Sequence, residues 1–183
     1  MLKDKKMPTY RCRDGCCCLQ IEEYDRSLPN EGFIRARKGQ RRKAGVFVFD
    51  PNTQKILLVQ SRGNLWGPPK GTALKRERAK NCAIRELREE TGISLSYKML
   101  SRYVIICNRA TYFFVEMDEI PVSVQTEIQG NDANGVGWVS LTCLQQLILH
   151  REIRLNQHCK LLLRKFLGVT VTLPPASILT EQE

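Results

Sequence analysis

The sequence predicts an α+β domain in which a β-sheet and helices form layers around one core. Three observations support this prediction: two apolar runs at residues 44–50 and 55–61, an acid-rich segment with helical spacing at residues 77–91, and an amphipathic segment at residues 156–167. Layered packing is favoured because strands bury a sheet face and each helix buries one stripe. The chain of 183 residues, 42% of them apolar, is long enough for one domain plus tails.

We expect three regions along the chain. Residues 1–42 form a basic N-terminal extension that contains cysteines, residues 43–168 form the folded domain, and residues 169–183 form a tail with two adjacent prolines. One short strand is expected near residues 17–21. Six of the nine residues from Arg35 to Lys43 are basic, and the first apolar strand begins where this run ends.

The first half of the domain contains a hairpin, a loop and a helix. The runs 44–50 and 55–61 flank an Asp-Pro-Asn turn, which predicts a β-hairpin. Residues 64–71 contain two prolines and two glycines, so we expect a loop without regular structure. The helix of residues 77–91 should end at Gly92, which can adopt the left-handed conformation of a helix C-cap.

The second half begins with strands. Residues 103–108 and 111–117 have strand character and should pair as a hairpin around Arg109–Ala110. Residues 118–135 are polar and rich in turn residues, so we expect a mobile loop there. A short strand should follow at residues 137–140.

Two helices are expected near the C-terminus. Ser140 is a candidate N-cap for a helix that begins at Leu141. The last helix spans about residues 156–167 and has an apolar stripe. Basic residues lie in and around it: Arg151, Arg154, Lys160, Arg164 and Lys165.

Three acids of the central helix share one face. Glu86, Glu89 and Glu90 stand at positions i, i+3 and i+4. Like charges at this spacing repel one another, so a cation is the natural occupant of the face, and hard divalent ions prefer carboxylate oxygens. The alternative is a solvated surface helix whose acids pair with Arg85 and Arg88.

The whole string GTALKRERAKNCAIRELREETGI narrows this choice. Gly71, five residues, Glu77, seven residues and then Arg85-Glu86-Leu87-x-Glu89-Glu90-x-Gly92-Ile93 resembles the Nudix hydrolase signature at every specified position. The resemblance covers residues 43–138 and implies a mixed β-sheet sandwiched between helices. It also implies an enzyme that cleaves a nucleoside diphosphate linked to another moiety with Mg²⁺ or Mn²⁺.

The resemblance implies separate roles for the motif residues. Glu86, Glu89 and Glu90, together with the carbonyl of Gly71, would hold the metal. Glu77 and Arg85 would pair with each other and brace the loop and helix. Catalysis would involve Glu89, and the general base is open between Glu90 in the helix and Glu127 in a distal loop.

Two residues before the helix have open assignments. Lys70 is either a phosphate contact or an ordinary surface lysine. Trp66 either stacks on a base or packs in the core.

The flanking sequence resembles that of mRNA-decapping Nudix enzymes. The same residue pattern occurs here as Trp66, Pro69-Lys70-Gly71 and Cys82-Ala83-Ile84-Arg85-Glu86. Glu127-Ile128 and Trp138 resemble a distal element of those enzymes, although the spacing here is several residues longer. The residues before position 43 are too few for the helical regulatory domain of cellular decapping enzymes, so we expect either a minimal, virus-like form or an enzyme that is not a decapping enzyme.

The implied substrate is capped RNA, cleaved in its phosphate bridge to release m7GDP. The net charge of +10 suits a polyanionic partner, although each basic segment is equally consistent with a solvated face. Candidate RNA contacts are Arg41, Arg42, Lys43, Arg151, Arg154, Lys160, Arg164 and Lys165. Open alternatives are a hydrolase of diphosphoinositol or dinucleoside polyphosphates and a non-catalytic RNA-binding protein with a Nudix fold.

The eight cysteines are expected to be reduced thiols in a cytoplasmic protein, because the N-terminus has no apolar signal region. No apolar run is long enough for a membrane span, and the oligomeric state stays open. Cys12 and Cys16 have the spacing of half a zinc site, for which Cys159 or His158 would supply the rest, but the sequence has no second paired cluster, which favours free thiols. Small core roles are expected for Cys82, Cys107 and Cys143.

Overall fold

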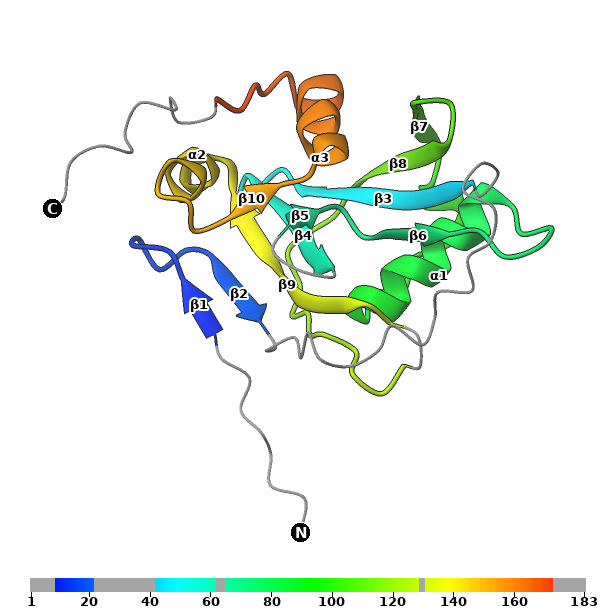
Figure 1. The fold of residues 1–183 in the computed structure, drawn as a ribbon, viewed down its shortest axis with the longest axis horizontal. Helices are drawn as coiled ribbons and strands as arrows, with labels where there is room; N and C mark the ends of the chain where they lie inside the picture. Colours follow the sequence, from blue (N-terminus) through cyan, green and yellow to red (C-terminus); the bar gives the residue numbers. More distant parts are fainter. Residues whose placement is uncertain (1–8, 22–41, 62–64, 129–130, 173–183) are drawn as a thin grey trace, which may run out of the picture.

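The computed structural model describes residues 9–21, 42–61, 65–128 and 131–172 of the chain. A twisted sheet forms its centre, and helices lie on both sides of it (Figure 1). The helices are α1 (Ala79–Thr91), α2 (Leu141–Leu149), α3 (Gln157–Leu162), a 3₁₀ turn (Tyr97–Met99) and a π-helical turn (Leu163–Leu167). The mixed sheet between helices confirms the predicted α+β class.

The sheet follows the order β1-β2-β9-β4-β3-β8-β7, with β5 beside β4 and β6 beside β3. β3 and β8 run parallel, whereas β3 and β4, like β4 and β9, run antiparallel. The strands are β1 (Thr9–Arg11), β2 (Cys18–Ile21), β3 (Lys43–Asp50), β4 (Lys55–Ser61), β5 (Leu65–Gly67), β6 (Lys70–Thr72), β7 (Arg102–Ile106), β8 (Ala110–Glu116), β9 (Ala133–Ser140) and β10 (Arg154–Leu155).

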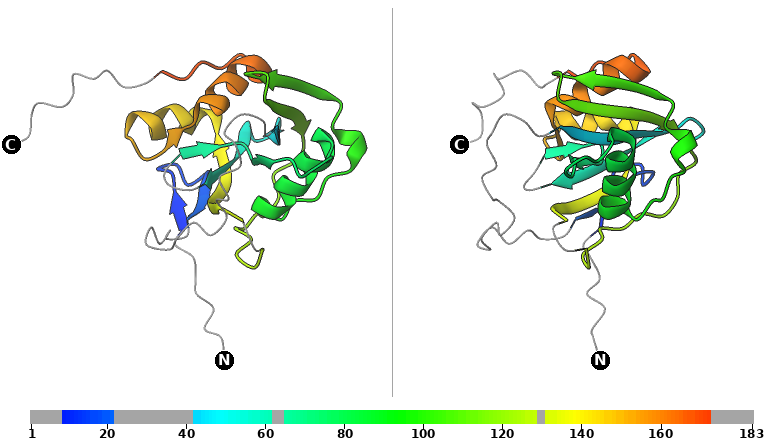
Figure 2. Two further views of the ribbon diagram at one scale, coloured as in Figure 1. Left: turned by 45° about the vertical axis from the view of Figure 1, so that its right-hand side comes forward. Right: turned by 90° about the vertical axis from the view of Figure 1, so that its right-hand side faces the viewer.

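The central strands are buried on both faces. Because successive side chains of a strand point to opposite sides, Val46 of β3 packs with the α1 side of the core, whereas Phe47 packs with the α2 and α3 side. Leu57 and Leu58 of β4 divide in the same way. This double burial explains why both strands are continuous apolar runs rather than alternating ones. Figure 2 shows the helices around the sheet from two further sides.

The predicted hairpin of β3 and β4 and the pairing of β7 with β8 are confirmed. Three predicted helix boundaries also hold. Ser140 accepts a hydrogen bond from the Thr142 backbone N–H at the start of α2. Gly92 ends α1 with a φ angle of 80°. Asn156 caps α3 through the Cys159 backbone N–H.

The prediction of a loop without regular structure at residues 64–71 is wrong. β5 and β6 occupy most of this segment and pair with β4 and β3. Pro68 and Pro69 lie between the two short strands, where the missing N–H groups remove no ladder hydrogen bond. The carbonyl of Pro69 even accepts a hydrogen bond from the backbone N–H of Val46.

Other boundaries differ from the prediction. The β7–β8 turn spans residues 107–109, with positive φ angles at Cys107 and Asn108; it includes Arg109, as predicted, but Ala110 already belongs to β8. β9 begins at Ala133 rather than Gly137, because Gly135 pairs with both Gln60 and Ile21. The predicted strand near residues 17–21 is present as β2 and joins β9, so this part of the N-terminal extension belongs to the main sheet.

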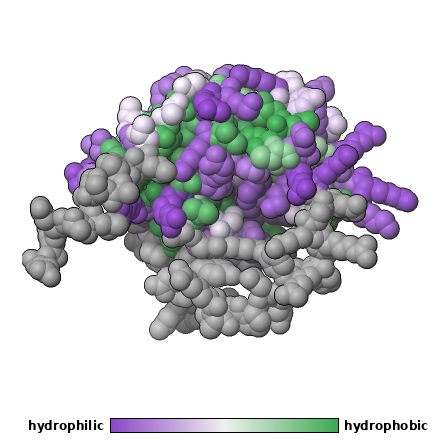
Figure 3. All heavy atoms as spheres, turned by 45° about the horizontal axis from the view of Figure 1, so that its top comes forward, coloured by the Kyte–Doolittle hydropathy of each residue, from purple (hydrophilic) through white to green (hydrophobic). Residues whose placement is uncertain are grey.

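The surface is mainly hydrophilic but contains apolar areas. Figure 3 shows green apolar surface between purple hydrophilic side chains on the side of the molecule that is uppermost in Figure 1. Tyr103 and Ile105 on the edge strand β7 are among the exposed large apolar residues. In the part of the chain that the structure describes, none of the helices has the length and apolar character needed to span a bilayer.

Candidate active site

Helix α1 positions the acids of the motif. Its buried side, with Cys82, Ala83 and Leu87, packs against β3 and its neighbours. The backbone N–H of Gly92 bonds to the carbonyl of Arg88 and closes the helix. The orientation of the helix is therefore fixed by apolar packing, and the acidic residues lie along the boundary between core and surface.

Glu90 is the most deeply buried acid of the motif, with only 3% of its surface exposed. Its Oε2 accepts a hydrogen bond of 2.8 Å from the backbone N–H of Lys70 in β6. Burial raises the pKa of Glu90 to about 8; Lys70 opposes this shift, and Asp132 and Glu86 add to it. The contact ties the strand before the helix to the end of the helix.

Gly71 lies directly against the carboxylate of Glu86. A Cβ atom at position 71 would stand 2.0 Å from both Cδ and Oε2 of Glu86, far inside van der Waals contact. A larger side chain at this point of β6 would push the Glu86 carboxylate out of its present position. Burial raises the pKa of Glu86, and Arg85 lowers it.

Arg85 connects the acids of the motif. Its Nε and Nη2 donate to the two carboxylate oxygens of Glu77 at 2.9 Å each, in a bidentate pair. Its Nη1 lies 2.8 Å from Oε1 of Glu86 and 2.8 Å from Oε2 of Glu89. Nη2 also donates to the carbonyl of Thr72 at 3.2 Å. The expected pairing of Arg85 with Glu77 is present in the structure, and its bracing role stays a prediction.

The structure separates the two distal acids near the site. Glu127 is exposed, and its Oε1 accepts a hydrogen bond of 3.5 Å from the hydroxyl of Thr126. Asp132 raises the pKa values of both Glu86 and Glu90 through its charge. The amide of the adjacent Asn131 donates to the carbonyl of Glu89 at 2.8 Å and fixes this loop to α1. Asp132 has no motif signal in the sequence, and its place becomes visible only in the fold.

The donor set suits a hard divalent cation. Glu86, Glu89 and Glu90 provide carboxylate oxygens in one region, and Asp132 adds negative charge to it. Oxygen ligands of this kind bind Mg²⁺ and Mn²⁺ in proteins. The close fit of Gly71 against Glu86 shows that the cluster is built compactly rather than spread over a solvated face.

A pocket of about 280 Å³ adjoins these acids through Lys70. It lies between the end of β4, strands β5 and β6, and the start of α3, and its lining residues are Val59, Ser61, Leu65, Lys70, Asn156, Gln157 and His158. The Nδ1 atom of His158 lies 2.8 Å from the Tyr112 hydroxyl, which fixes its ring. Burial lowers the pKa of His158, and Lys70 and Lys43 lower it further.

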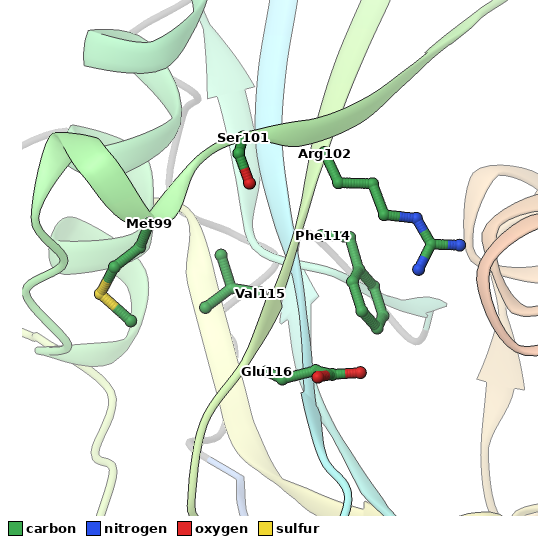
Figure 4. A pocket seen from close by; sticks show the side chains of 6 residues that line it. All are labelled: Met99, Ser101, Arg102, Phe114, Val115 and Glu116. Carbon is green, nitrogen blue, oxygen red and sulfur yellow. The ribbon is translucent and has the colours of Figure 1, made fainter.

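A larger pocket of about 370 Å³ lies elsewhere, on β7 and β8. Figure 4 shows its lining residues, Met99, Ser101, Arg102, Phe114, Val115 and Glu116. The Arg102 guanidinium lies over the ring of Phe114, 4.7 Å from its centroid. No motif acid lines either pocket, but the smaller one contains Lys70, whose backbone N–H bonds to Glu90, so we assign the chemistry to the pocket beside Lys70.

The structure places most of the candidate RNA-contacting residues at the surface. Arg42, Lys43, Arg151, Arg154, Arg164 and Lys165 are exposed and Lys160 is half-buried, whereas Arg41 lies outside the described residues. Arg164 and Lys165 follow α3, whose first residues line the pocket beside Lys70. Trp66 is 1% exposed and packs in the core, which settles its open assignment in favour of packing.

The cysteines depart from the sequence expectations in two respects. Cys107 is exposed in the β7–β8 turn, so its predicted core role is wrong. Cys159 is a buried residue of α3 and His158 bonds to Tyr112, and neither belongs to the group that Cys12 and Cys16 form with Cys17 and Cys143.

Comparison with known proteins agrees with this geometry. A model of the NUDIX domain family matches residues 39–157. The protein 111R of Invertebrate iridescent virus 3, which is named as a hydrolase, is 32% identical over 167 residues, covering 86% of this chain and 94% of that protein. The m7GpppN-mRNA hydrolase of Saccharomyces cerevisiae is 35% identical over 78 residues, covering 42% of this chain and 7% of that protein.

A solved structure supports the same fold. A bifunctional NMN adenylyltransferase/ADP ribose pyrophosphatase from Francisella tularensis superposes with a TM-score of 0.55 over 73% of this chain and 42% of that chain, at 20% identity. The family model spans well over half of the chain, and the signature residues meet where β6 runs beside α1. The chain therefore belongs to the Nudix family and is a Nudix hydrolase.

Proposed function

We propose that this Nudix hydrolase removes the 5′ cap of RNA and releases m7GDP, using Mg²⁺ or Mn²⁺. The observation that carries the proposal is the segment from Trp66 to Gly92, which contributes the residues of the candidate site and resembles decapping enzymes in sequence. The partial identity with the yeast m7GpppN-mRNA hydrolase is consistent with it. Because the match spans 7% of that enzyme, the substrate is part of the proposal.

The reaction is a hydrolysis of one phosphoanhydride bond. The oxygen of water forms a bond to a phosphorus of the triphosphate bridge, and the P–O bond to the next phosphate breaks. The products are m7GDP and RNA with a 5′-monophosphate, and the water protons pass to the solvent through a base. Such a displacement needs neutralised phosphate charge, a positioned water and a stabilised leaving group.

The chain's own residues would divide these tasks. Glu86, Glu89 and Glu90 would hold the divalent cation, which when bound neutralises phosphate charge and acidifies water. Lys70 would contact a bridging phosphate, because its backbone is fixed by Glu90 and it lines the adjacent pocket. The base would be Glu90 or Glu127, and the position of Asp132 beside Glu86 and Glu90 makes it a third candidate.

The surroundings of the pocket support a long anionic substrate. The pocket beside Lys70 has apolar and polar lining and room for part of a nucleotide. Arg164 and Lys165 are exposed after α3, and Arg42 and Lys43 are exposed at the start of β3. Salt-sensitive contacts from such residues to the RNA body would add affinity that a free cap dinucleotide lacks.

Incubation with cap-labelled RNA and Mg²⁺ or Mn²⁺ tests the proposal. We expect release of m7GDP from long capped RNA and much less from free cap dinucleotide. Glu89→Gln should abolish release while leaving the folded state intact. Glu116→Gln, a change at an exposed acid of β8 in the separate pocket of Figure 4, should retain it. Turnover restricted to diphosphoinositol or diadenosine polyphosphates would reject decapping, and no turnover of any of them would favour RNA binding alone.

A binding measurement separates the RNA surface from the chemistry. The double charge reversal Arg164→Glu with Lys165→Glu should weaken binding of capped RNA and flatten its salt dependence. The double change Arg11→Glu with Lys98→Glu removes the same charge at exposed positions outside the motif and the candidate RNA contacts, and it serves as the control. Equal affinities of the two double variants would argue against an RNA surface after α3.

A further inference from the structure

Four cysteines from distant parts of the chain meet on the side of the sheet that carries α2. Cys12, Cys16 and Cys17 belong to the β1–β2 hairpin, and Cys143 lies in the first turn of α2. Their sulfur atoms all lie within 4.8 Å of one another. The neighbouring Cys18, the first residue of β2, is exposed and is not part of this group.

The sulfur spacing matches a tetrahedral metal site. Cys16 Sγ lies 3.5 Å from Cys12 Sγ, 3.6 Å from Cys17 Sγ and 3.4 Å from Cys143 Sγ. Cys12 Sγ and Cys143 Sγ are 3.8 Å apart. Four thiolates at about 2.3 Å from a zinc ion stand about 3.8 Å from each other in a regular tetrahedron. A disulfide needs about 2.05 Å, so these thiols are not bonded to one another.

The backbone around the cluster has the features of a built thiolate site. The N–H of Ser140 donates to Cys17 Sγ at 3.2 Å, and the N–H of Cys17 donates to Cys12 Sγ at 3.3 Å. Hydrogen bonds of this kind orient the sulfur ligands of a metal site. Gly15 has a φ angle of 68° and donates to the Cys12 carbonyl, which closes the turn between Cys12 and Cys16.

We propose that Cys12, Cys16, Cys17 and Cys143 bind one structural zinc ion, which joins the β1–β2 hairpin to α2. Four protein ligands complete the tetrahedron, so the site leaves no position open for substrate. Sulfur ligands favour zinc, whereas the carboxylates of α1 favour Mg²⁺ or Mn²⁺, so the two sites select different metals. Figure 1 shows the hairpin and α2 at one side of the molecule and α1 at the other.

The physical reason for such an ion lies in the small size of the hairpin. β1 is three residues long and β2 is four, and β2 alone pairs with the main sheet, through β9. A two-stranded hairpin has little stability of its own in water. A zinc ion shared with Cys143 would link the hairpin to a helix that follows β9, and thereby fix it from two directions.

Metal analysis of the full chain tests this proposal. We expect inductively coupled plasma mass spectrometry to find one zinc ion per chain after purification without chelators. The chain reconstituted with Co²⁺ should show the visible absorption bands of a tetrahedral thiolate site. Removal of the metal with a strong chelator should lower the thermal midpoint of unfolding, and added Zn²⁺ should restore it.

Two exposed cysteines provide a matched pair of variants. Cys16→Ser removes one sulfur ligand, whereas Cys107→Ser changes an exposed cysteine in the distant β7–β8 turn. We expect zinc affinity to fall by orders of magnitude in Cys16→Ser and to be unchanged in Cys107→Ser. Because Cys16 is exposed, its replacement should leave the fold intact, which circular dichroism can check. Equal zinc affinities in the two variants would overturn the proposal. So would a wild-type chain that binds neither Zn²⁺ nor Co²⁺, or one that holds these cysteines as disulfides.

Discussion

The replacement Gly71→Ala tests the geometry of the acidic site most directly. The added Cβ would stand 2.0 Å from the Glu86 carboxylate carbon, whereas carbon atoms in contact are about 3.5–4.0 Å apart. The carboxylate or the strand must therefore shift by about 1.5–2 Å. A misplacement of about 1 Å in a catalytic constellation can cost about 100-fold in rate. We predict a loss of at least this size in kcat/KM, together with weaker Mn²⁺ binding measured by electron paramagnetic resonance.

A second substitution and a control make this prediction specific. In the double variant Gly71→Ala with Glu86→Asp, the shorter acid should relieve the clash with the added Cβ. Part of the Mn²⁺ affinity should then return, which would appear as a positive coupling in the double-mutant cycle. Gly168→Ala, at a φ angle of 70° with free space around it, should cost about 1 kcal/mol of stability and leave activity unchanged. Wild-type activity and Mn²⁺ affinity in Gly71→Ala would refute the proposed role of Gly71 and Glu86.

Three further predictions follow from individual contacts. Burial tends to raise the pKa of Asp50, but hydrogen bonds from Glu119, Thr53 and Asn52 outweigh it and lower the pKa. The stability that Asp50 contributes is present above the ordinary carboxyl pKa and is lost as the pH falls through the pKa of the folded state. Asp50→Ala should therefore lower the free energy of unfolding in urea by about 1–3 kcal/mol at pH 7, and the difference from the wild type should shrink in acid. Arg85→Lys should lose the fork on Glu77 and about 1–2 kcal/mol of stability; an unchanged urea midpoint would contradict this. If Asp132 is the distal acid, Asp132→Asn should reduce kcat more than Glu127→Gln does, and the reverse order would favour Glu127.

The elements that local sequence determines were predictable. β3 and β4 read as continuous apolar runs because they are buried on both faces, and Gly92 ends α1 because a left-handed residue is needed there. The short strands β5 and β6 were not predictable from composition. They exist because β3 and β4 offer hydrogen-bonding edges to a segment whose prolines lie in the gap between the strands.

Long-range contacts set the limit for the sites as well. The spacing of the motif acids is local, so the acidic face of α1 could be predicted from the sequence. Cys143 and Cys12 are 131 positions apart in the chain, and their contact depends on β2 pairing with β9. The pairing of β9 with β4 likewise carries the loop before it, and with it Asp132, to the acids of α1. Neither Cys143 nor Asp132 lies in a local sequence pattern that would indicate its role.

The charge balance around α1 is the strongest argument against a solvated surface helix. Four acids of the motif, Glu77, Glu86, Glu89 and Glu90, surround the single guanidinium of Arg85, which contacts three of them. Glu90, the fourth, is buried and accepts only a backbone N–H among the described contacts. Burial of an ionised carboxylate is costly unless a cation compensates its charge, and without an ion this cost raises the pKa of Glu90 to about 8. A face that needed only solubility would leave these acids in water, so the arrangement supports a divalent ion held by Glu86, Glu89 and Glu90.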